Sequence, residues 1–303
     1  MYVLHIRCIL CRELGIIFWK SVPLDLNAGK RDQEPEAWGR GYMNILFIGD
    51  IVGRPGRNLV KVLLPSIIRE HKVDFVIANA ENAAGGKGIT GPIKDELVGA
   101  GIDVLTMGNH VWDNKAVFDF IDNEPRIVRP GNYPGDCPGQ GYHTYISGNC
   151  TRVTVVNLSG RVFMNSLDCP FRTADRILDE VRGTSDVIIV DFHAEATSEK
   201  QAMGWYLDGK VSAVIGTHTH VQTADERILP GGTAYITDVG MTGPMDSILG
   251  MVKEEALHKF LTQRPVRLTV ARGRSQLDAV LLRFDPENFT VKTIKRVRYY
   301  SEE

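Results

Sequence analysis

The sequence predicts an α/β fold whose functional residues gather at one edge of one sheet. Five short, nearly continuous apolar runs are typical of strands buried on both faces, and each is followed by a carboxylate, a carboxamide or an imidazole. In open α/β sheets, sites form at the carboxyl ends of the strands. The runs and the residues after them are 44–49 with Asp50, 74–80 with Glu81 and Asn82, 103–108 with Asn109 and His110, 187–192 with His193, and 211–215 with His218 and His220.

Local patterns predict the elements between the first three runs. Pro55 suits a first helical position, and apolar side chains fall on one face of 55–71. A second helix is expected over 90–100, closed by Gly101. A third is expected over 114–122, before a stretch rich in proline and glycine at 125–141.

The pattern changes at 142–158, where two strands surround a turn, as in a hairpin. This antiparallel segment predicts either a second sheet or an appended flap. Residues 238–244 are expected to form a loop at the functional edge. The remaining elements are helices at 175–182, 198–207 and 252–261, a strand at 234–237, and a closing antiparallel pair at 277–284 and 289–297.

Composition and charge exclude several classes of protein. The 303 residues carry 35 basic and 37 acidic side chains, a formal net charge of -2, which argues against a surface that coats nucleic acid. No run approaches the length of a membrane span. Five cysteines are an odd number in a chain too long to need disulfides. They favour a reducing compartment and predict a cytoplasmic protein.

The first 42 residues differ from the rest of the chain, because they show no steady hydrophobic period. Met43 stands directly before the first clean strand. We therefore expect residues 1–42 to be a disordered extension or a mis-assigned start, and residues 43–303 to form a single domain.

The residues at the five strand ends indicate a metal site. They form a set of oxygen and nitrogen donors without a thiolate, too many for one tetrahedral zinc ion. Two first-row ions such as Mn²⁺ or Fe²⁺ suit the set, with Zn²⁺ as a further candidate. Taken singly, Asp50 could cap a turn and Asn109 could be a turn residue, but their joint occurrence favours ligation. Glu81 is the candidate bridge between ions roughly 3.5–4 Å apart.

These residues resemble the calcineurin-like metallophosphoesterases, and specifically their YmdB-type branch. The resemblance covers Met43 to the C-terminal strands. Its motifs are Gly49-Asp50-Ile51-Val52-Gly53, Asn79-Ala80-Glu81-Asn82, Thr106-Met107-Gly108-Asn109-His110 and Gly216-Thr217-His218-Thr219-His220.

The resemblance implies a four-layer α/β/β/α sandwich, a dinuclear metal centre and phosphodiesterase activity on cyclic nucleotides, 2′,3′-cyclic ones included. A hydroxide that bridges the metals would attack phosphorus, and His110 would protonate the leaving group. The implied metal ligands are Asp50, Glu81, Asn82, Asn109, His193, His218 and His220.

Three positions depart from the broad family pattern. Val52 stands where most members have a histidine, and Glu81 replaces the usual bridging aspartate. Val111 follows His110 where an acidic residue is common, which leaves His110 without a carboxylate next to it in the sequence. The first departure removes an imidazole from one ion, and Asn82 is the candidate substitute.

Two other classes of function stay open. The same centre could serve a phosphomonoesterase or a nuclease, or a metal- or nucleotide-binding regulator with incidental activity. We expect a small phosphodiester or nucleotide as substrate, no membrane, no stable nucleic-acid complex, and a chain that can form a homo-oligomer. The sequence identifies no substrate-binding residue.

Overall fold

The computed structural model describes residues 41–301 of the 303-residue chain. The expected extension, 1–42, lies outside the described residues except for Gly41 and Tyr42, so that prediction stays untested. None of the described helices is both long enough and apolar enough to cross a membrane.

Within the described residues, eight strands form the first sheet, in the order β2-β12-β13-β1-β3-β4-β5 with β14 beside β13. β1, β3, β4 and β5 run parallel, and β13 is antiparallel to both β1 and β14. The strands are β1 Met43–Ile48, β2 Asp50–Ile51, β3 Phe75–Asn79, β4 Val104–Thr106, β5 Ile127–Val128, β12 Met241–Pro244, β13 Ser275–Phe284 and β14 Val291–Tyr300.

The second sheet has six strands over the same part of the chain, in the order β10-β11-β9-β8-β7-β6. Its four central strands run parallel, and an antiparallel strand closes each edge. The strands are β6 Tyr142–Ile146, β7 Arg152–Ser159, β8 Val187–His193, β9 Ala213–Thr217, β10 Arg227–Ile228 and β11 Ala234–Ile236.

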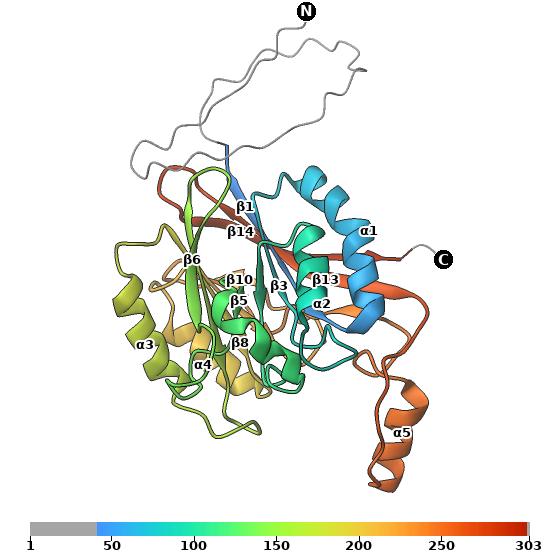
Figure 1. The fold of residues 1–303 in the computed structure, drawn as a ribbon. Coiled ribbons are helices and arrows are strands. Elements are labelled where there is room, and N and C mark those ends of the chain that lie inside the picture. Colours follow the sequence, from blue (N-terminus) through green and yellow to red (C-terminus); the bar gives the residue numbers. More distant parts are fainter. Residues whose placement is uncertain (1–40, 302–303) are drawn as a thin grey trace, which may run out of the picture. The chain divides into compact units, whose positions relative to one another are not determined.

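The two sheets pack face to face between two layers of helices (Figure 1). Alternation along β1 sets the layers, because Ile45 and Phe47 face the second sheet while Leu46 and Ile48 face the helices. The expected four-layer α/β/β/α sandwich is confirmed. Helices α1 Gly53–His71 and α2 Gly91–Gly99 cover the first sheet, and α3 Pro170–Val181 and α4 Thr197–Tyr206 cover the second.

The expectation that the functional strands belong to one sheet was wrong. β1, β3 and β4 lie in the first sheet, whereas β8 and β9 lie in the second. An apolar run shows only that both faces of a strand are buried. Strands in a single sheet covered by helices meet this condition, and strands in a two-sheet sandwich meet it too. The antiparallel segment 142–158 belongs to the second sheet and is not an appended flap.

Two local predictions also needed correction. The helix expected over 114–122 is a pair of short 3₁₀ helices, η1 Lys115–Asp119 and η2 Ile121–Asn123. They are separate because Phe120, at φ −142°, leaves the helical region between them. The loop expected over 238–244 contains the short strand β12.

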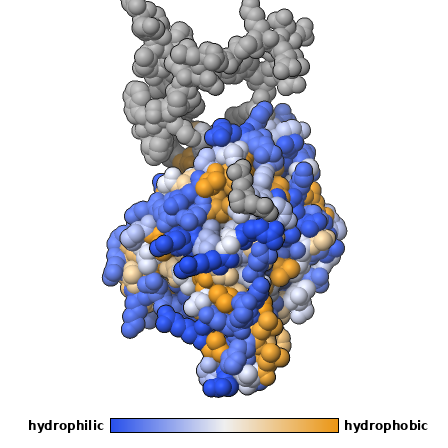
Figure 2. Space-filling view, turned by 90° about the vertical axis from the view of Figure 1, so that its right-hand side faces the viewer, coloured by the Kyte–Doolittle hydropathy of each residue, from blue (hydrophilic) through white to orange (hydrophobic). Residues whose placement is uncertain are grey.

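Helix α5, Lys253–Thr262, stands away from the sandwich (Figure 1). It exposes 49% of Leu257, 68% of Phe260 and 82% of Leu261. The face in Figure 2 shows hydrophobic surface at its lower end, where α5 lies.

Candidate metal centre

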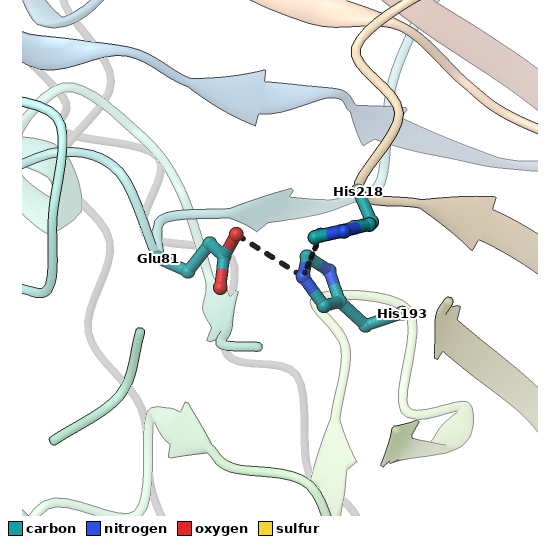
Figure 3. A group of neighbouring side chains, drawn as sticks. All are labelled: Glu81, His193 and His218. Carbon is teal, nitrogen blue, oxygen red and sulfur yellow. Dashed lines mark hydrogen bonds and ion pairs between the residues drawn. The ribbon is translucent and has the colours of Figure 1, made fainter. Parts of the chain in front are cut away.

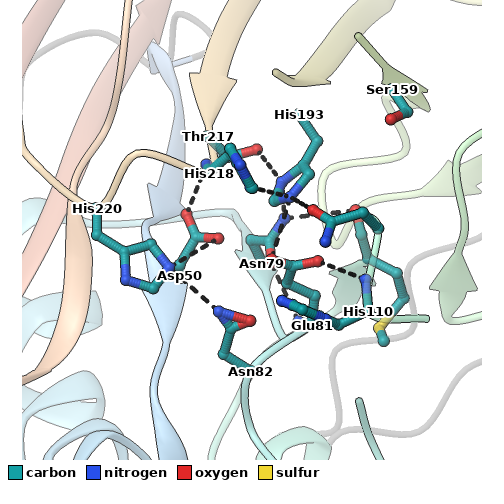
Figure 4. Close-up of polar contacts among 12 residues, drawn as sticks. Asp50, Asn79, Glu81, Asn82, His110, Ser159, His193, Thr217, His218 and His220 are labelled. Atoms are coloured by element: carbon teal, nitrogen blue, oxygen red, sulfur yellow. Dashed lines mark hydrogen bonds and ion pairs between the residues drawn. The ribbon is translucent and has the colours of Figure 1, made fainter. Parts of the chain in front are cut away.

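The strand topology brings all eight predicted site residues to one place between the two sheets, and Figure 4 labels all of them except Asn109. The first sheet supplies the residues that follow β1, β3 and β4, and the second sheet supplies those at the ends of β8 and β9. Most of these side chains are buried, with Asp50 and His193 fully so. These residues are Asp50, Glu81, Asn82, Asn109, His110, His193, His218 and His220.

The first ligand group consists of Glu81, Asn109, His193 and His218 (Figure 3 shows all but Asn109). His193 Nε2 is the centre of this group. It lies 3.1 Å from Glu81 Oε1, 3.1 Å from Asn109 Oδ1 and 3.0 Å from His218 Nδ1. Glu81, His193 and His218 each offer a ligand atom within 4.8 Å of the others. Atoms that all carry lone pairs approach this closely only around a proton or a cation.

Two residues behind His193 fix which of its nitrogens faces this group. Thr217 Oγ1 donates a hydrogen bond of 2.7 Å to Asp191 Oδ1 and lies 2.8 Å from His193 Nδ1. Because the hydroxyl has one hydrogen, it must accept from Nδ1–H, which leaves the lone pair of Nε2 for a ligand. Burial raises the pKa of Asp191 to about 6, so the carboxylate is ionised at neutral pH. This arrangement is common behind metal-binding histidines.

The charges of the first group favour a cation. Burial lowers the pKa of His193, but the charge of Glu81 beside it raises that pKa to about 9. Burial and the charge of His193 lower the pKa of His218 to about 3. The first group therefore stabilises one positive charge, which the proton of His193 supplies. A metal ion bound here must displace that proton.

The second ligand group consists of Asp50, Asn82 and His220. Asp50 Oδ1 and Asn82 Oδ1 are buried and have no hydrogen-bond partner among the described residues. His220 Nε2 lies 3.7 Å from Asp50 Oδ1 and 3.1 Å from Asn82 Nδ2. Its Nδ1 lies 3.2 Å from the carbonyl of Leu249, so Nδ1–H donates there and Nε2 keeps its lone pair. A half-turn of the Asn82 amide would present an oxygen at the same place.

These observations fit a divalent metal ion. Burial would raise the pKa of Asp50, but the neighbouring imidazole of His220 lowers it to about 2, so the carboxylate is ionised. Unpaired buried oxygens cost free energy unless they find a partner, and a cation supplies one. Carboxylate, amide and imidazole ligands suit first-row metals.

Gly108 allows the side chains of the first group to lie close to the backbone between β4 and Asn109. A Cβ at this position would collide with Glu81 Oε2 and His193 Nε2. Only glycine permits the chain to carry Asn109 so close to these side chains.

His110 lies beside the first group and is held by two contacts. Its backbone N–H donates to Glu81 Oε2 at 3.1 Å, and its Nδ1 lies 2.9 Å from Asp113 Oδ2. The side chain is 26% exposed, so solvent and substrate can reach it. The orienting carboxylate that is missing next to His110 in the sequence therefore comes from three residues further on.

Sequence reasoning missed the residues that shape the His218-Thr219-His220 turn. Both histidines have positive φ, 97° and 61°. Thr219 between them donates its N–H, at 3.0 Å, and its hydroxyl, at 2.6 Å, to Asp238 Oδ2. Lys200, which is 1% exposed, pairs with the same oxygen at 2.7 Å. The hydrogen bonds of Asp238 therefore hold this turn in place.

Comparisons with known proteins agree with this geometry. The family model described as YmdB-like protein matches residues 46–297. A curated protein of Bacillus subtilis, named 2′,3′-cyclic-nucleotide 2′-phosphodiesterase, is 53% identical over 84% of this chain and 96% of its own length.

Two solved structures are similar over most of the chain. A hypothetical protein from Thermus thermophilus is 44% identical, with a TM-score of 0.81 over 86% of this chain and 100% of its own. A phosphatase from Mycoplasma pneumoniae is 34% identical, with a TM-score of 0.81 over 86% of this chain and 94% of its own.

Proposed function

Since the chain belongs to the YmdB-like protein family, we propose that it is a metal-dependent phosphodiesterase that hydrolyses 2′,3′-cyclic nucleotides. One observation carries this proposal. Buried oxygen and nitrogen donors from five strands converge in a chain that is 53% identical to a relative named as such a phosphodiesterase. The resemblance found in the sequence and the general class of phosphoric ester hydrolase are thus confirmed.

The proposed centre holds two divalent ions, Fe²⁺ or Mn²⁺, with Zn²⁺ as a further candidate. The first ligand group would hold one ion and the second group the other, with Glu81 reaching both. In support of this, burial and the charge of Asp50 oppose ionisation of Glu81, but the charge of His193 and its hydrogen bond lower the pKa of Glu81, so its ionised carboxylate interacts with residues of both groups. When bound, the ions would neutralise charge on the phosphate and lower the pKa of the attacking water.

His110 is the proposed general acid. The carboxylate of Asp113 lies 2.9 Å from Nδ1 and accepts from Nδ1–H, which orients the ring and leaves Nε2 for the proton that is transferred. Nε2–H is then available to the oxygen that leaves phosphorus. A ribose oxygen leaves poorly unless it is protonated as the bond breaks.

A substrate panel tests the proposal. Metal-loaded protein should hydrolyse 2′,3′-cyclic nucleotides faster than 3′,5′-cyclic nucleotides, linear diesters and monoesters, and a chelator should abolish the activity. A preference for monoesters would indicate a phosphomonoesterase, and a preference for long RNA a nuclease. Nucleotide binding without turnover above background would indicate a regulator.

We propose a cytoplasmic location and self-association into a homo-oligomer. The exposed apolar side chains of α5 support self-association, since large apolar groups in water are costly. Light scattering of the purified chain tests it, and a monomer at all concentrations would refute it.

A further inference from the structure

A cavity of about 370 Å³ lies one strand away from the metal centre in both sheets. We call it the edge cavity. Residues that follow β5, the neighbour of β4, form one wall, and the segments after β7, the neighbour of β8, form the other. The residues used below are Tyr133, Gly135, Tyr142, Asp168 and Arg176.

The wall after β5 is tied to β7, the neighbour of the strand that carries His193. Ser159 at the end of β7 pairs with His193 on β8, and it lies beside the site in Figure 4. Asn132 donates to the carbonyls of Ser159, at 2.9 Å, and Asp168, at 3.0 Å, and accepts from the Ser159 N–H at 2.8 Å. The cavity and the metal centre therefore share one rigid frame.

Tyr133 separates the edge cavity from the segment that carries His110. Its ring meets Trp112, two residues after His110, edge-on at 5.7 Å and 82°. Burial raises the pKa of Tyr133, and the charges of Glu81 and Asp113 raise it further. The charges of the first ligand group and of the partner of His110 thus reach the phenol.

The wall of the cavity is held in shape by an arginine that donates hydrogen bonds to its own loop. Arg129, 5% exposed, donates to the carbonyls of Pro130, Cys137 and Pro138 at 2.8, 2.9 and 2.8 Å. These bonds fix the turn that carries Gly135. A fixed wall lowers the entropy cost of binding a ligand there.

The chemistry of a cyclic nucleotide places its nucleoside on the side of the metal centre where the edge cavity lies. The oxygen that leaves phosphorus belongs to the ribose, and the base is attached to the same sugar. If His110 protonates that oxygen, the ribose and base must lie on the His110 side of the phosphate. His110 follows β4, and the next strand outward is β5, whose following loop forms the cavity wall.

We propose that the edge cavity is the subsite for the ribose and base of a nucleotide substrate. Its volume lies within the range of small-molecule sites, roughly 300–1,000 Å³. Tyr133 and Tyr142 supply aromatic faces for a base, and Asp168 and Arg176 supply polar groups for its edge or for the sugar hydroxyls. This inference rests on the proposed function and adds a place for the part of the substrate beyond the phosphate.

The test uses a matched pair of glycines. A Cβ at Gly135 in the cavity wall would meet nothing within 4 Å, and the same holds for Gly148 in the hairpin turn after β6. Neither has a positive φ, so tryptophan can replace each without backbone strain. Gly135→Trp should obstruct the cavity, whereas Gly148→Trp is the control. Arg176→Trp, on the exposed side of α3, is a second obstructing variant.

Two measurements decide the outcome. The first is the ratio of kcat/KM for 2′,3′-cyclic AMP to that for methyl p-nitrophenyl phosphate, a diester without a nucleoside. The obstructing variants should lower this ratio about tenfold, the size of one lost base contact, and Gly148→Trp should leave it unchanged. The second is calorimetric binding of adenosine 3′-monophosphate, which should weaken by a similar factor in the obstructing variants alone.

The outcomes separate this inference from the proposed function. If the obstructing variants bind the nucleotide as tightly as the wild type does, the subsite is wrong, whatever the activity. If the wild type hydrolyses neither diester but loses nucleotide binding on obstruction, the subsite stands and the phosphodiesterase proposal falls.

Discussion

Asp50 illustrates how a fully buried carboxylate can be kept ionised for a metal ion. His220 lowers its pKa to about 2, and Oδ1 has no hydrogen-bond donor among the described residues. A neutral isostere would keep the shape of the side chain but lose the charge that attracts the ion. The value of this residue therefore lies in its charge and not in its packing.

Asp50→Asn should accordingly weaken metal binding more than the 10–100-fold expected for loss of an outer partner of a ligand. Elemental analysis and metal titration measure this effect. Asp74→Asn is the control, because Asp74 is also a carboxylate that accepts a backbone N–H, from Asn44 at 2.8 Å, but it lies at the other end of β3. Full metal occupancy in Asp50→Asn would contradict the ligand role.

His110 separates catalysis from metal holding. His110→Ala removes the proposed proton donor but keeps the backbone N–H that binds Glu81. The variant should keep its metal and lose roughly 10²–10⁴-fold in rate on a cyclic nucleotide. The loss on bis(p-nitrophenyl) phosphate should be distinctly smaller, because nitrophenolate leaves without a proton.

Asp113→Asn provides a graded comparison for this prediction. It weakens the contact that orients the His110 ring but leaves the ring in place, so its rate on the cyclic nucleotide should fall between those of the wild type and His110→Ala. Equal losses on both substrates in His110→Ala, with full metal occupancy, would rule out the acid role.

At the scale of elements, the turn after β9 depends on a charge pair from two other segments. Lys200 on α4 and Asp238 after β11 form a pair that is buried on both sides, at 1% and 0% exposure. Asp238 also accepts the Gly240 N–H at 2.8 Å through its other oxygen. The backbone of two proposed metal ligands, His218 and His220, is thus held from outside the turn.

Lys200→Met should cost about 3–5 kcal/mol in the free energy of unfolding, because it leaves a buried carboxylate without its counter-charge. Lys210→Met, which removes a surface pair with Asp175 at 3.5 Å, should cost under about 1 kcal/mol. Urea unfolding without added metal measures both. We also expect weaker metal binding in Lys200→Met, rescued by excess Mn²⁺. If Lys200→Met lowers the free energy of unfolding no more than Lys210→Met does, the buried pair does not stabilise the turn.

The long elements could be predicted from the sequence, and the short ones could not. Helix α1 and strands β13 and β14 carry steady patterns over many residues. Strands of two residues, such as β2, β5 and β10, are too short to show a period, and only the strand beside them defines them. Pro170 was a missed start signal for α3, which begins five residues before the predicted 175–182.

For the molecule as a whole, the sequence predicted the candidate ligands better than it predicted the residues that hold those ligands in place. The candidate ligands stand out because polar residues end apolar runs. Asp191 lies within such a run and Thr217 lies just after one, and neither position shows in the sequence which residue it meets across the sheet. Lys200 lies 18 residues before His218 on a helix, and no local pattern joins them. The number of sheets came from the family resemblance, because strand patterns alone do not encode it.

The net charge of the chain bears on the size of its substrate. A formal charge of -2 gives little long-range attraction for a polyanion. A protein that contacts many phosphates releases many counterions, so its affinity falls steeply as salt rises. A cyclic nucleotide carries one phosphate and releases few. We therefore expect kcat/KM on 2′,3′-cyclic AMP to change by less than about threefold between 50 and 200 mM salt. A steep fall with salt, together with faster cleavage of long RNA than of the cyclic nucleotide, would favour the nuclease alternative, because contacts far from the metal centre would then govern binding.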